Sequence, residues 1–288
     1  MDTTNRTTWM ITGASQGFGR DIAAEVLARG HTVIAIVRDS SRVVDLVAAN
    51  PGRVEVVEAD LAQQEGVDHA VMIARDREVG VLVNNAGRAI CGAAEEVSMS
   101  DLRAQLELNF FAAAALTRAV LPGMRAQGYG TVVQLSSQGG RLSFPGVGAY
   151  SASKFALEGW SEALAGEVAP LGIRVMLVEP SRFRTGFNTT RSLGFAEQSG
   201  VYASTVGRVA ADLAGVDGRQ EGDPVRAARI IADIVASAEV PLRLPLGAEA
   251  VDRLLAAYTS GTAAVETWAD VARSADFPSA GDRASRPV

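Results

Sequence analysis

Short apolar runs rich in β-branched residues alternate along the chain with longer segments of helical periodicity. The apolar runs span residues 7–12, 31–37, 53–59, 79–85, 131–137, 173–180 and 240–247. The helical patterns span residues 18–30, 41–50, 66–79, 100–128 and 150–170, and they resume from near Pro224 to about residue 274. Strands that are apolar throughout and separated by helices are typical of a parallel sheet buried on both faces. With right-handed crossovers, the pattern predicts an α/β fold with a doubly wound parallel sheet and helices on both faces.

The pattern loosens after Pro180, where the chain becomes rich in Gly, Ser and Thr with scattered aromatic residues. We interpret residues of about 186–220 as a substrate lid with short helices. No internal repeat and no Pro-rich or Ser-rich linker divides the sequence, so residues 1–288 are expected to form one domain. Residues of about 275–288 are expected to form a flexible tail.

Composition narrows the functional classes. The 288 residues are 48% hydrophobic with a net charge of −6, a pI near 5.1 and no long run of like charges, so nucleic acid and acidic membranes are poor partners. The single cysteine, Cys91, forbids an intrachain disulfide, and we interpret it as a buried thiol rather than a nucleophile. The sequence shows neither a secretory signal nor the roughly 18 consecutive apolar residues of a membrane span, so a cytoplasmic location is expected.

A glycine-rich turn joins the first strand to the first helix. Gly13, Gly17 and Gly19 lie in TGASQGFG, and such a turn can cradle phosphate because backbone amides and the positive helix end converge on an anion. The spacing is not GxGxxG, and a tight turn with packing glycines is the alternative. The same stretch contains GASQG, which matches a GxSxG nucleophile elbow. A hydrolase of that type needs a late histidine, whereas His31 and His69 are both early, so we reject that reading; a zinc site is equally unsupported.

Lys154 is the only lysine in a chain whose 26 other basic side chains are arginines. It lies four residues after Tyr150 in a helical pattern, so the two side chains are neighbours on one face. A free tyrosine titrates near pH 10, and a nearby ammonium group favours the phenolate and lowers the pKa. The pair therefore indicates a tyrosine that works as an acid or base.

Taken together, the motifs identify a family resemblance. They are TGASQGFG at 12–19, NNAG at 84–87, LSS at 135–137 and YSASK at 150–154, with Asn109 in LELNFF. The sequence resembles the short-chain dehydrogenase/reductase family, in the single-domain branch with TGxxxGxG and YxxxK motifs. The resemblance implies a Rossmann-type sheet of about seven strands in the order 3-2-1-4-5-6-7, and an NAD(P)-dependent oxidoreductase that interconverts a ketone and a secondary alcohol.

The resemblance implies a catalytic set of Asn109, Ser137, Tyr150 and Lys154. Tyr150 would exchange a proton with the substrate oxygen, and Ser137 would hydrogen-bond that oxygen. Lys154 would lower the tyrosine pKa and hold the nicotinamide ribose, while Asn109 would bind a water that links Lys154 to solvent. Two alternatives stay open: Ser136 as the reactive serine, although spacing to Tyr150 favours Ser137, and Asn109 as a mere helix irregularity.

Cofactor choice depends on the end of the second strand, where an acidic side chain would bind the 2′-hydroxyl of NAD. Val37 stands at that position and Arg38 follows, which suits a 2′-phosphate and favours NADP, with NAD as the alternative. Asp39 and Gln16 count against this choice. The cofactor-binding residues expected from the resemblance are Gly13, Ser15, Gln16, Gly17, Phe18, Gly19, Arg38, Asp60, Leu61, Asn85, Ala86, Gly87, Tyr150, Lys154, Pro180 and Thr185. The family's usual Pro-Gly is here Pro180-Ser181, a departure that bears on the pocket floor.

The substrate is expected to be a small-molecule ketone or secondary alcohol, and no metal site is expected. The expected substrate-binding residues are Ser137, Phe144, Tyr150 and Phe183, with Phe187 and Tyr202 as further candidates that lid packing would explain equally well. By analogy, the resemblance implies a homodimer or homotetramer. Two other functions stay open: a nucleotide-binding sensor or interaction protein, and a family fold redirected to dehydration or epimerisation.

Overall fold

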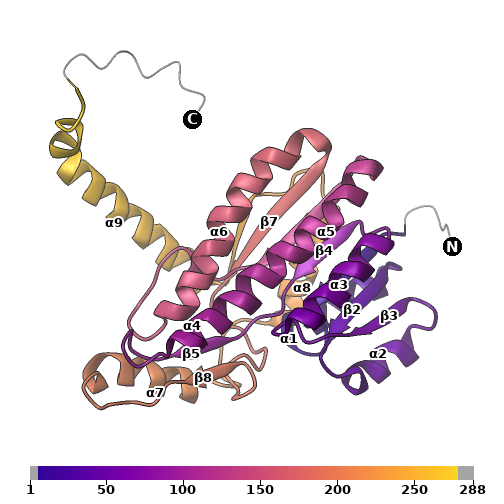
Figure 1. The fold of residues 1–288 in the computed structure, drawn as a ribbon, viewed down its shortest axis with the longest axis horizontal. Helices are drawn as coiled ribbons and strands as arrows, with labels where there is room; N and C mark the ends of the chain where they lie inside the picture. The colour runs from indigo at the N-terminus through magenta and orange to yellow at the C-terminus, as the bar shows by residue number, and fades with distance from the viewer. Residues whose placement is uncertain (1–5, 278–288) are drawn as a thin grey trace.

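The structure is a computed structural model that describes residues 6–277, and its centre is a seven-stranded parallel sheet (Figure 1). The strand order is β3-β2-β1-β4-β6-β7-β9. The strands are β1 (Thr8–Thr12), β2 (Thr32–Val37), β3 (Val54–Glu58), β4 (Val81–Asn84), β6 (Gly130–Leu135), β7 (Ile173–Pro180) and β9 (Arg243–Leu246). This confirms the predicted doubly wound sheet and its order 3-2-1-4-5-6-7, counted over the strands of this sheet.

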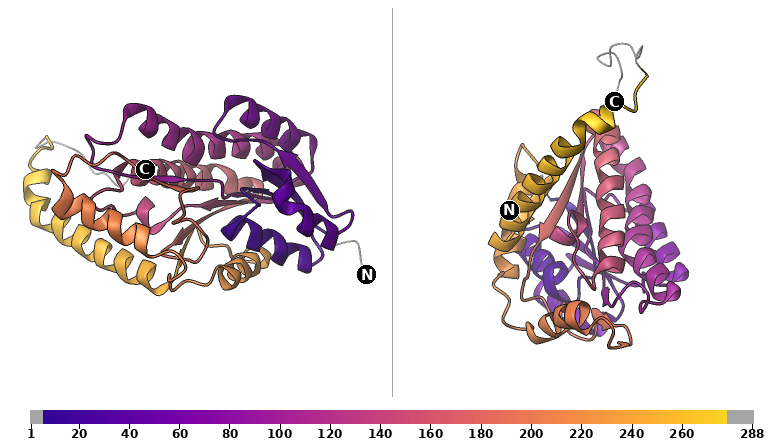
Figure 2. Two further views of the ribbon diagram at one scale, coloured as in Figure 1. Left: turned by 90° about the horizontal axis from the view of Figure 1, so that it is seen from below. Right: turned by 90° about the vertical axis from the view of Figure 1, so that its left-hand side faces the viewer.

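Helices cover both faces of the sheet (Figure 2). One layer contains α1 (Gly17–Ala28), α8 (Pro224–Ala236) and the short α2 (Val44–Ala49), which follows the 3₁₀ turn η2 (Ser40–Val43). The other layer contains α3 (Gln64–Asp76), α5 (Ala112–Gln127) and α6 (Gly148–Val168), with α4 (Met99–Leu106) before α5. A short 3₁₀ turn, η5 (Ala169–Leu171), follows α6.

The two layers are separate apolar cores because successive side chains of a strand point to opposite faces. In β1, Ile11 packs in the core under α1 and α8, whereas Met10 packs in the core under α3 and α5. In β2, Ala35 and Ile36 divide in the same way. Both faces of these strands are therefore buried, which explains why they are apolar throughout rather than alternating.

Two features of the fold were not predicted from sequence. The first is a small parallel sheet formed by β5 (Ala89–Cys91) and β8 (Leu193–Phe195), which ties the segment after β7 to the segment after β4. The second is an interruption in the helical pattern of residues 100–128, where α4 and α5 are separated by a π-helical turn, η3 (Glu107–Phe111). Single π turns inside helices are frequent at functional sites.

The segment between β7 and α8 lies along one end of the molecule (Figure 1). It contains β8, a π turn η6 (Ala203–Gly207) and α7 (Arg208–Gly215). The last helix, α9 (Ala248–Arg273), packs its first turns against β9 and then projects from the body. The predicted flexible tail falls almost wholly on residues 278–288, outside the described part of the chain. Within residues 6–277, no helix combines the length and apolar character needed to cross a membrane.

Candidate active site

The glycine-rich turn after β1 forms a backbone cradle at the start of α1. Gly13 and Gly17 have φ angles of +66° and +53°, which glycine adopts without steric cost. A Cβ added at Gly17 would lie 2.9 Å from the carbonyl oxygen of Thr185. The N-cap residue Gln16 makes no side-chain capping bond, and the first turn of α1 holds no acidic residue. The first amides of α1 are therefore free to bind an anion, as a nucleotide pyrophosphate requires.

The end of β4 is held against this turn by hydrogen bonds. The hydroxyl oxygen of Thr12 accepts from the backbone N–H groups of Asn85 and Ala86, both at 2.9 Å. The side-chain amide of Asn85 donates to the carbonyl of Thr12 at 2.8 Å. Gly19 packs α1 against this junction, since a Cβ there would lie 2.5 Å from both Asn85 Nδ2 and the Gly13 oxygen. The NNAG segment is thereby fixed beside the glycine turn.

A cavity of about 190 Å³ opens at these strand ends. Most of the predicted cofactor-binding residues line it: Gly13, Ser15, Gln16, Gly17, Phe18, Arg38, Asp60, Leu61, Asn85, Ala86, Gly87 and Thr185. Gly19 does not line it and has the packing role described above. The cavity lies outside the carboxyl ends of the strands, where open α/β sheets bind ligands.

Three residues at the end of β2 occupy the positions where the sequence predicts the contact that distinguishes NADP from NAD. Val37 is buried and Arg38 is exposed, and both line the cavity. Asp39 is not among the lining residues; its carboxylate caps η2 by accepting from Ser41 N at 3.0 Å and Ser41 Oγ at 2.6 Å. These bonds lower the pKa of Asp39, and the charge of Arg191 acts in the same direction. The acid that counted against NADP is thus engaged elsewhere.

A second cavity, of about 180 Å³, adjoins the first. The predicted residues that line it include Ser137 after β6, Tyr150 and Lys154 on α6, and Pro180 at the end of β7. Asn85, Gly87, Thr185, Phe18, Arg88 and Phe187 line both cavities. A molecule bound along the first cavity would therefore reach Ser137 and Tyr150.

Ser137 and Tyr150 face each other across the 3₁₀ turn η4 (Gln138–Gly140). A Cβ added at Gly139 would lie 3.3 Å from both Ser137 Oγ and Tyr150 Cε1. Ser137 Oγ accepts from Gly139 N at 3.0 Å and hydrogen-bonds Tyr150. Ser136 Oγ instead lies 2.6 Å from where a Cβ of Gly140 would stand, and it has no hydrogen-bond partner among the described residues. This geometry favours Ser137 over Ser136 as the reactive serine.

The electrostatics of Tyr150 and Lys154 differ from what the sequence predicts. Burial raises the pKa of Tyr150 to about 12, while the hydrogen bond with Ser137 acts in the opposite direction. The Nζ of Lys154 donates to the carbonyl of Leu135 at 2.6 Å and lies 5.9 Å from the centroid of the Tyr150 ring. Burial also lowers the pKa of Lys154 to about 8, against the charge of Glu158.

Asn109 lies in the π turn η3 and is 1% exposed. Its Nδ2 donates to the Arg88 carbonyl and to Ser153 Oγ, both at 3.0 Å, and its Oδ1 accepts from Arg88 N at 3.0 Å. The side chain therefore joins the segment after β4 to α6. With Oδ1 and Nδ2 engaged in these bonds, the water-binding role expected for Asn109 stays a prediction.

The aromatic candidates divide between the cavities and the interior. Phe144, Phe183 and Phe187 line the second cavity; the Phe187 ring is 5.9 Å from that of Tyr150. Phe183 is also core, 8% exposed and 5.1 Å from the Phe18 ring. Tyr202 lines neither cavity.

Ser181, which stands where the family usually has glycine, does not adopt a left-handed backbone conformation, because no non-glycine residue within 6–277 has positive φ. Ser181 lines the second cavity, and its Oγ donates to Leu246 O at 3.3 Å. Cys91 lines the same cavity from β5 and is 2% exposed. Burial raises its pKa, which keeps it a neutral thiol.

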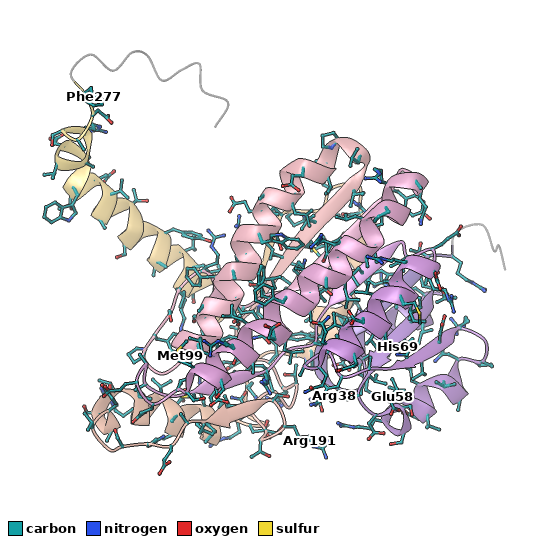
Figure 3. All side chains as sticks on the ribbon, viewed as in Figure 1. Arg38, Glu58, His69, Met99, Arg191 and Phe277 are labelled. Carbon is teal, nitrogen blue, oxygen red and sulfur yellow. The ribbon has the colours of Figure 1, made fainter. Side chains whose placement is uncertain are left out.

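Sequence reasoning missed several residues that line the first cavity, among them three polar ones: Arg88, Arg191 and Ser192. Arg88 directly follows NNAG and could have been included with it. Ser192 Oγ accepts from Gln16 Nε2 at 3.3 Å, which joins the segment after β7 to the glycine turn. Arg191 lines the cavity together with Arg38 (Figure 3). No local signal marks Arg191 or Ser192, since the β5–β8 pairing brings them there.

Comparison with known proteins relates this chain to one family. The family model described as short chain dehydrogenase matches residues 7–194. A 3-ketodihydrosphingosine reductase of Bacteroides thetaiotaomicron is 37% identical over 241 residues, which cover 83% of this chain and 87% of that protein.

Solved structures of dehydrogenases also resemble this chain. A short-chain dehydrogenase from Streptomyces avermitilis is 44% identical with a TM-score of 0.89, covering 96% of this chain and all of the other. A Beutenbergia cavernae protein, described as a candidate NAD(P)-dependent gluconate 5-dehydrogenase with bound NADP at low occupancy, is 32% identical with a TM-score of 0.69. That likeness covers 85% of this chain and 96% of the other.

Proposed function

This chain belongs to the short-chain dehydrogenase family of oxidoreductases, and from that premise we propose that it is an NADPH-dependent enzyme that interconverts a ketone and a secondary alcohol. The observation that carries the proposal is the continuity of the two cavities. The glycine turn and Arg38 lie on the first, and Ser137 and Tyr150 lie on the second, next to residues that line both. A sensor that only binds a nucleotide would not need Ser137, Tyr150 and Lys154 on one cavity.

The residues suggest the following division of work in ketone reduction. NADPH, when bound, supplies the hydride. Tyr150 donates its phenol proton to the carbonyl oxygen, and the Ser137 hydroxyl hydrogen-bonds the same oxygen and orients it. Lys154 binds the ribose hydroxyls and stabilises the phenolate that the proton transfer leaves. Solvent then returns a proton to Tyr150, and alcohol oxidation runs through the same groups in reverse.

A panel of ketones and secondary alcohols, assayed with NADPH, NADP, NADH and NAD, tests this function. The second cavity is lined largely by apolar and aromatic side chains, so bulky and long-chain ketones belong in the panel. The Bacteroides relative is named for a long-chain ketone, which adds a reason to include that class. Absence of turnover across the panel, with NADPH bound, would favour a sensor; loss of water or inversion at carbon would favour dehydration or epimerisation.

Arg38→Ala is expected to weaken NADPH binding about 10-fold to 100-fold and to leave NADH binding unchanged. The range corresponds to one lost charge-assisted hydrogen bond to a phosphate. Fluorescence titration with both cofactors measures it. Arg42→Ala is the matched control, because Arg42 lies four residues further on and is not among the residues that line the cavity. An equal loss for both cofactors would contradict the assignment of Arg38 to the 2′-phosphate.

Arg191 supports the same preference from a second segment of the chain that lines the cavity. Its charge reaches Asp39, which follows Arg38 directly, so it is placed to face the same anion. Arg191→Ala is expected to weaken NADPH binding about twofold to fivefold, the size of an exposed ion pair, with little effect on NADH. The same titration measures this. A matching loss for NADH would assign Arg191 to the pyrophosphate instead.

Three further predictions accompany this function: a lid segment, an oligomeric state and a cellular location. The lid role of residues 186–220 is supported by side chains of this segment that line the cavities. Phe187 lines both cavities, Ser192 lines the first and Leu213 lines the second. A homodimer or homotetramer is supported by exposed rings on neighbouring helices, with Phe111 52% and Phe155 46% exposed. A cytoplasmic location stays a prediction from the sequence.

A further inference from the structure

Two buried carboxyl groups lie behind the active site and have no part in the mechanism above. Glu158 is one helical turn beyond Lys154 on α6, and Glu179 is the penultimate residue of β7. Their exposed fractions are 3% and 1%. Carboxylates are almost never this buried unless they are paired, so the surroundings of these two must account for them.

Two arginines approach the pair from different elements. Arg243 of β9 places Nε 3.1 Å from Glu158 Oε2 and 3.6 Å from Glu179 Oε1. Arg141, which follows η4, places Nη1 3.9 Å from Glu158 Oε2 and 3.8 Å from Glu179 Oε1. Arg243 also contacts the exposed Glu162 of α6 at 2.9 Å and thus divides its charge between carboxylates.

Helix α9 contributes the remaining charges on this side. Tyr258 stacks on Arg141, with the guanidinium carbon 5.3 Å from the ring centroid. Arg253 is paired with Glu249 at 2.7 Å, and Glu249 also contacts Arg182 at 3.8 Å. The groups facing the buried pair are therefore the two arginines, Glu162 and Lys154.

Hydrogen bonding shows that the two carboxyls are not equivalent. Glu158 Oε2 accepts from Arg243 Nε at 3.1 Å. Among the residues the structure describes, none donates to Glu158 Oε1 or to either oxygen of Glu179. Leaving three buried carboxylate oxygens without donors is costly, and a proton on the pair removes most of that cost. Burial, and then the charge of Glu158, raise the pKa of Glu179 to about 7.

Glu158 is electrically linked to Lys154. Their side chains pack against the same residue: a Cβ at Gly140 would lie 3.0 Å from Glu158 Cγ and 3.3 Å from Lys154 Cβ. The charge of Glu158 opposes the burial that lowers the pKa of Lys154. An ionised Glu158 therefore keeps the ammonium charged in a buried position.

We propose that Glu158 and Glu179 are positioning residues: they share one proton at neutral pH, the proton resides mainly on Glu179, and the ionised Glu158 holds Lys154 in its charged form. The effect on turnover rests on the proposed function, since it requires Lys154 to assist Tyr150. The proton exchanges between the pair and solvent, with no covalent or redox step. When the pair loses this proton, its second negative charge stabilises the ammonium further.

The only lysine of the chain makes this testable without an activity assay. Protein labelled with ¹³C at lysine Cε, on a lysine-free tag, gives a single resonance whose pH titration reports Lys154 directly. We expect a midpoint near the value of about 8 given above. In Glu158→Gln the midpoint should fall by about one unit, as expected on losing an opposite charge nearby. In Glu179→Gln it should fall by less.

Glu162→Gln is the matched control, because Glu162 contacts Arg243 from the same helix but is exposed. Its midpoint should equal that of the unchanged protein. The alkaline limb of the kcat profile should move with the resonance in each variant. Equal midpoints in Glu158→Gln and Glu162→Gln would overturn the proposal, whether or not the enzyme turns over a ketone.

A second measurement covers the case in which Glu158→Gln fails to fold. Infrared titration of the unsubstituted protein should show a protonated carboxyl band that disappears near pH 7, in keeping with the position of Glu179. A protein without that band at pH 6 would also overturn the proposal. A panel that finds no turnover, with the lysine shifts as expected, would instead count against the proposed function alone.

Discussion

Tyr150→Phe is expected to lower kcat for ketone reduction about 10²-fold to 10⁴-fold, the usual contribution of a positioned general acid. The substitution removes one hydroxyl and keeps the ring, which packs 5.9 Å from the ring of Phe187. The fold and the first cavity should therefore be unaffected, and NADPH should bind as before. Stopped-flow measurement of NADPH oxidation with the best ketone of the panel, together with fluorescence titration of the cofactor, separates chemistry from binding.

Tyr202→Phe is the matched control for this variant. The Tyr202 hydroxyl donates to Glu95 at the surface, and Tyr202 lines neither cavity. Its removal should leave turnover unchanged. If Tyr150→Phe reduced ketones at a rate close to that of the unchanged enzyme, Tyr150 would not be the proton donor.

The pH dependence of the two directions follows from the desolvation of Tyr150, which is partly buried beside the second cavity. With a pKa of about 12, Tyr150 carries its proton throughout the working range, which suits reduction without any shift. Alcohol oxidation needs the phenolate, so it depends on a cation brought against the phenol oxygen. Under the proposed mechanism, the alkaline limb of reduction should then follow Lys154, whose pKa of about 8 is the lower of the two. The charge state of Lys154 is therefore expected to determine how the rate of ketone reduction changes with pH.

The sheet could be predicted from the sequence because its strands are buried on both faces. Runs such as that of residues 173–180 have no polar face to maintain, and the run of β7 matches its observed bounds. The pair β5 and β8 could not be predicted in this way. Each has three residues, and the pairing joins Ala89 to Leu193 across about a hundred residues of chain. Strands of that length acquire their structure from tertiary contact rather than from local pattern.

The residues of the candidate site show the same difference between local sequence signals and tertiary contacts. Residues carried by local motifs, such as Gly17, Tyr150 and Lys154, could be identified because their spacing along the chain is itself the signal. Arg191 could not, because it reaches the nucleotide cavity only through the β5–β8 pairing. Glu179 carried a signal that was overlooked: a carboxylate near the end of a mostly apolar, buried strand demands a partner.

The direction of the Tyr150 pKa could not be predicted either. Helical spacing correctly made Tyr150 and Lys154 neighbours, but spacing says nothing about rotamers or burial. The Lys154 ammonium donates to Leu135 O, and the pKa of Tyr150 is raised by desolvation, with the hydrogen bond from Ser137 acting in the opposite direction. A ligand with ribose hydroxyls would offer the ammonium partners beside Tyr150 in place of that carbonyl.

Lys154→Arg is expected to lower kcat about 10²-fold to 10³-fold, the range seen when one preorganised donor is removed from an active site. The charge is kept, but the site is shaped for an ammonium: Lys154 is 5% exposed, and its Nζ lies 2.6 Å from Leu135 O. A planar guanidinium is larger and cannot make the same compact contact. Overpacking of this kind costs about 1–3 kcal/mol of stability, which thermal unfolding would detect.

Lys154→Met separates the two causes of that loss, because methionine is unbranched, fits the space of the lysine stem and carries no charge. If charge is what the site needs, Lys154→Met should lose at least as much turnover as Lys154→Arg while keeping more stability. If position is what matters, both should bind NADPH more weakly, because neither can offer the compact donor that the ribose hydroxyls require. Arg118→Lys, an exchange of the same two residue types on the exposed side of α5, should change neither property. Full activity in Lys154→Arg would show that any cation suffices beside Tyr150, and the single lysine of this chain would then have no chemical reason to be a lysine.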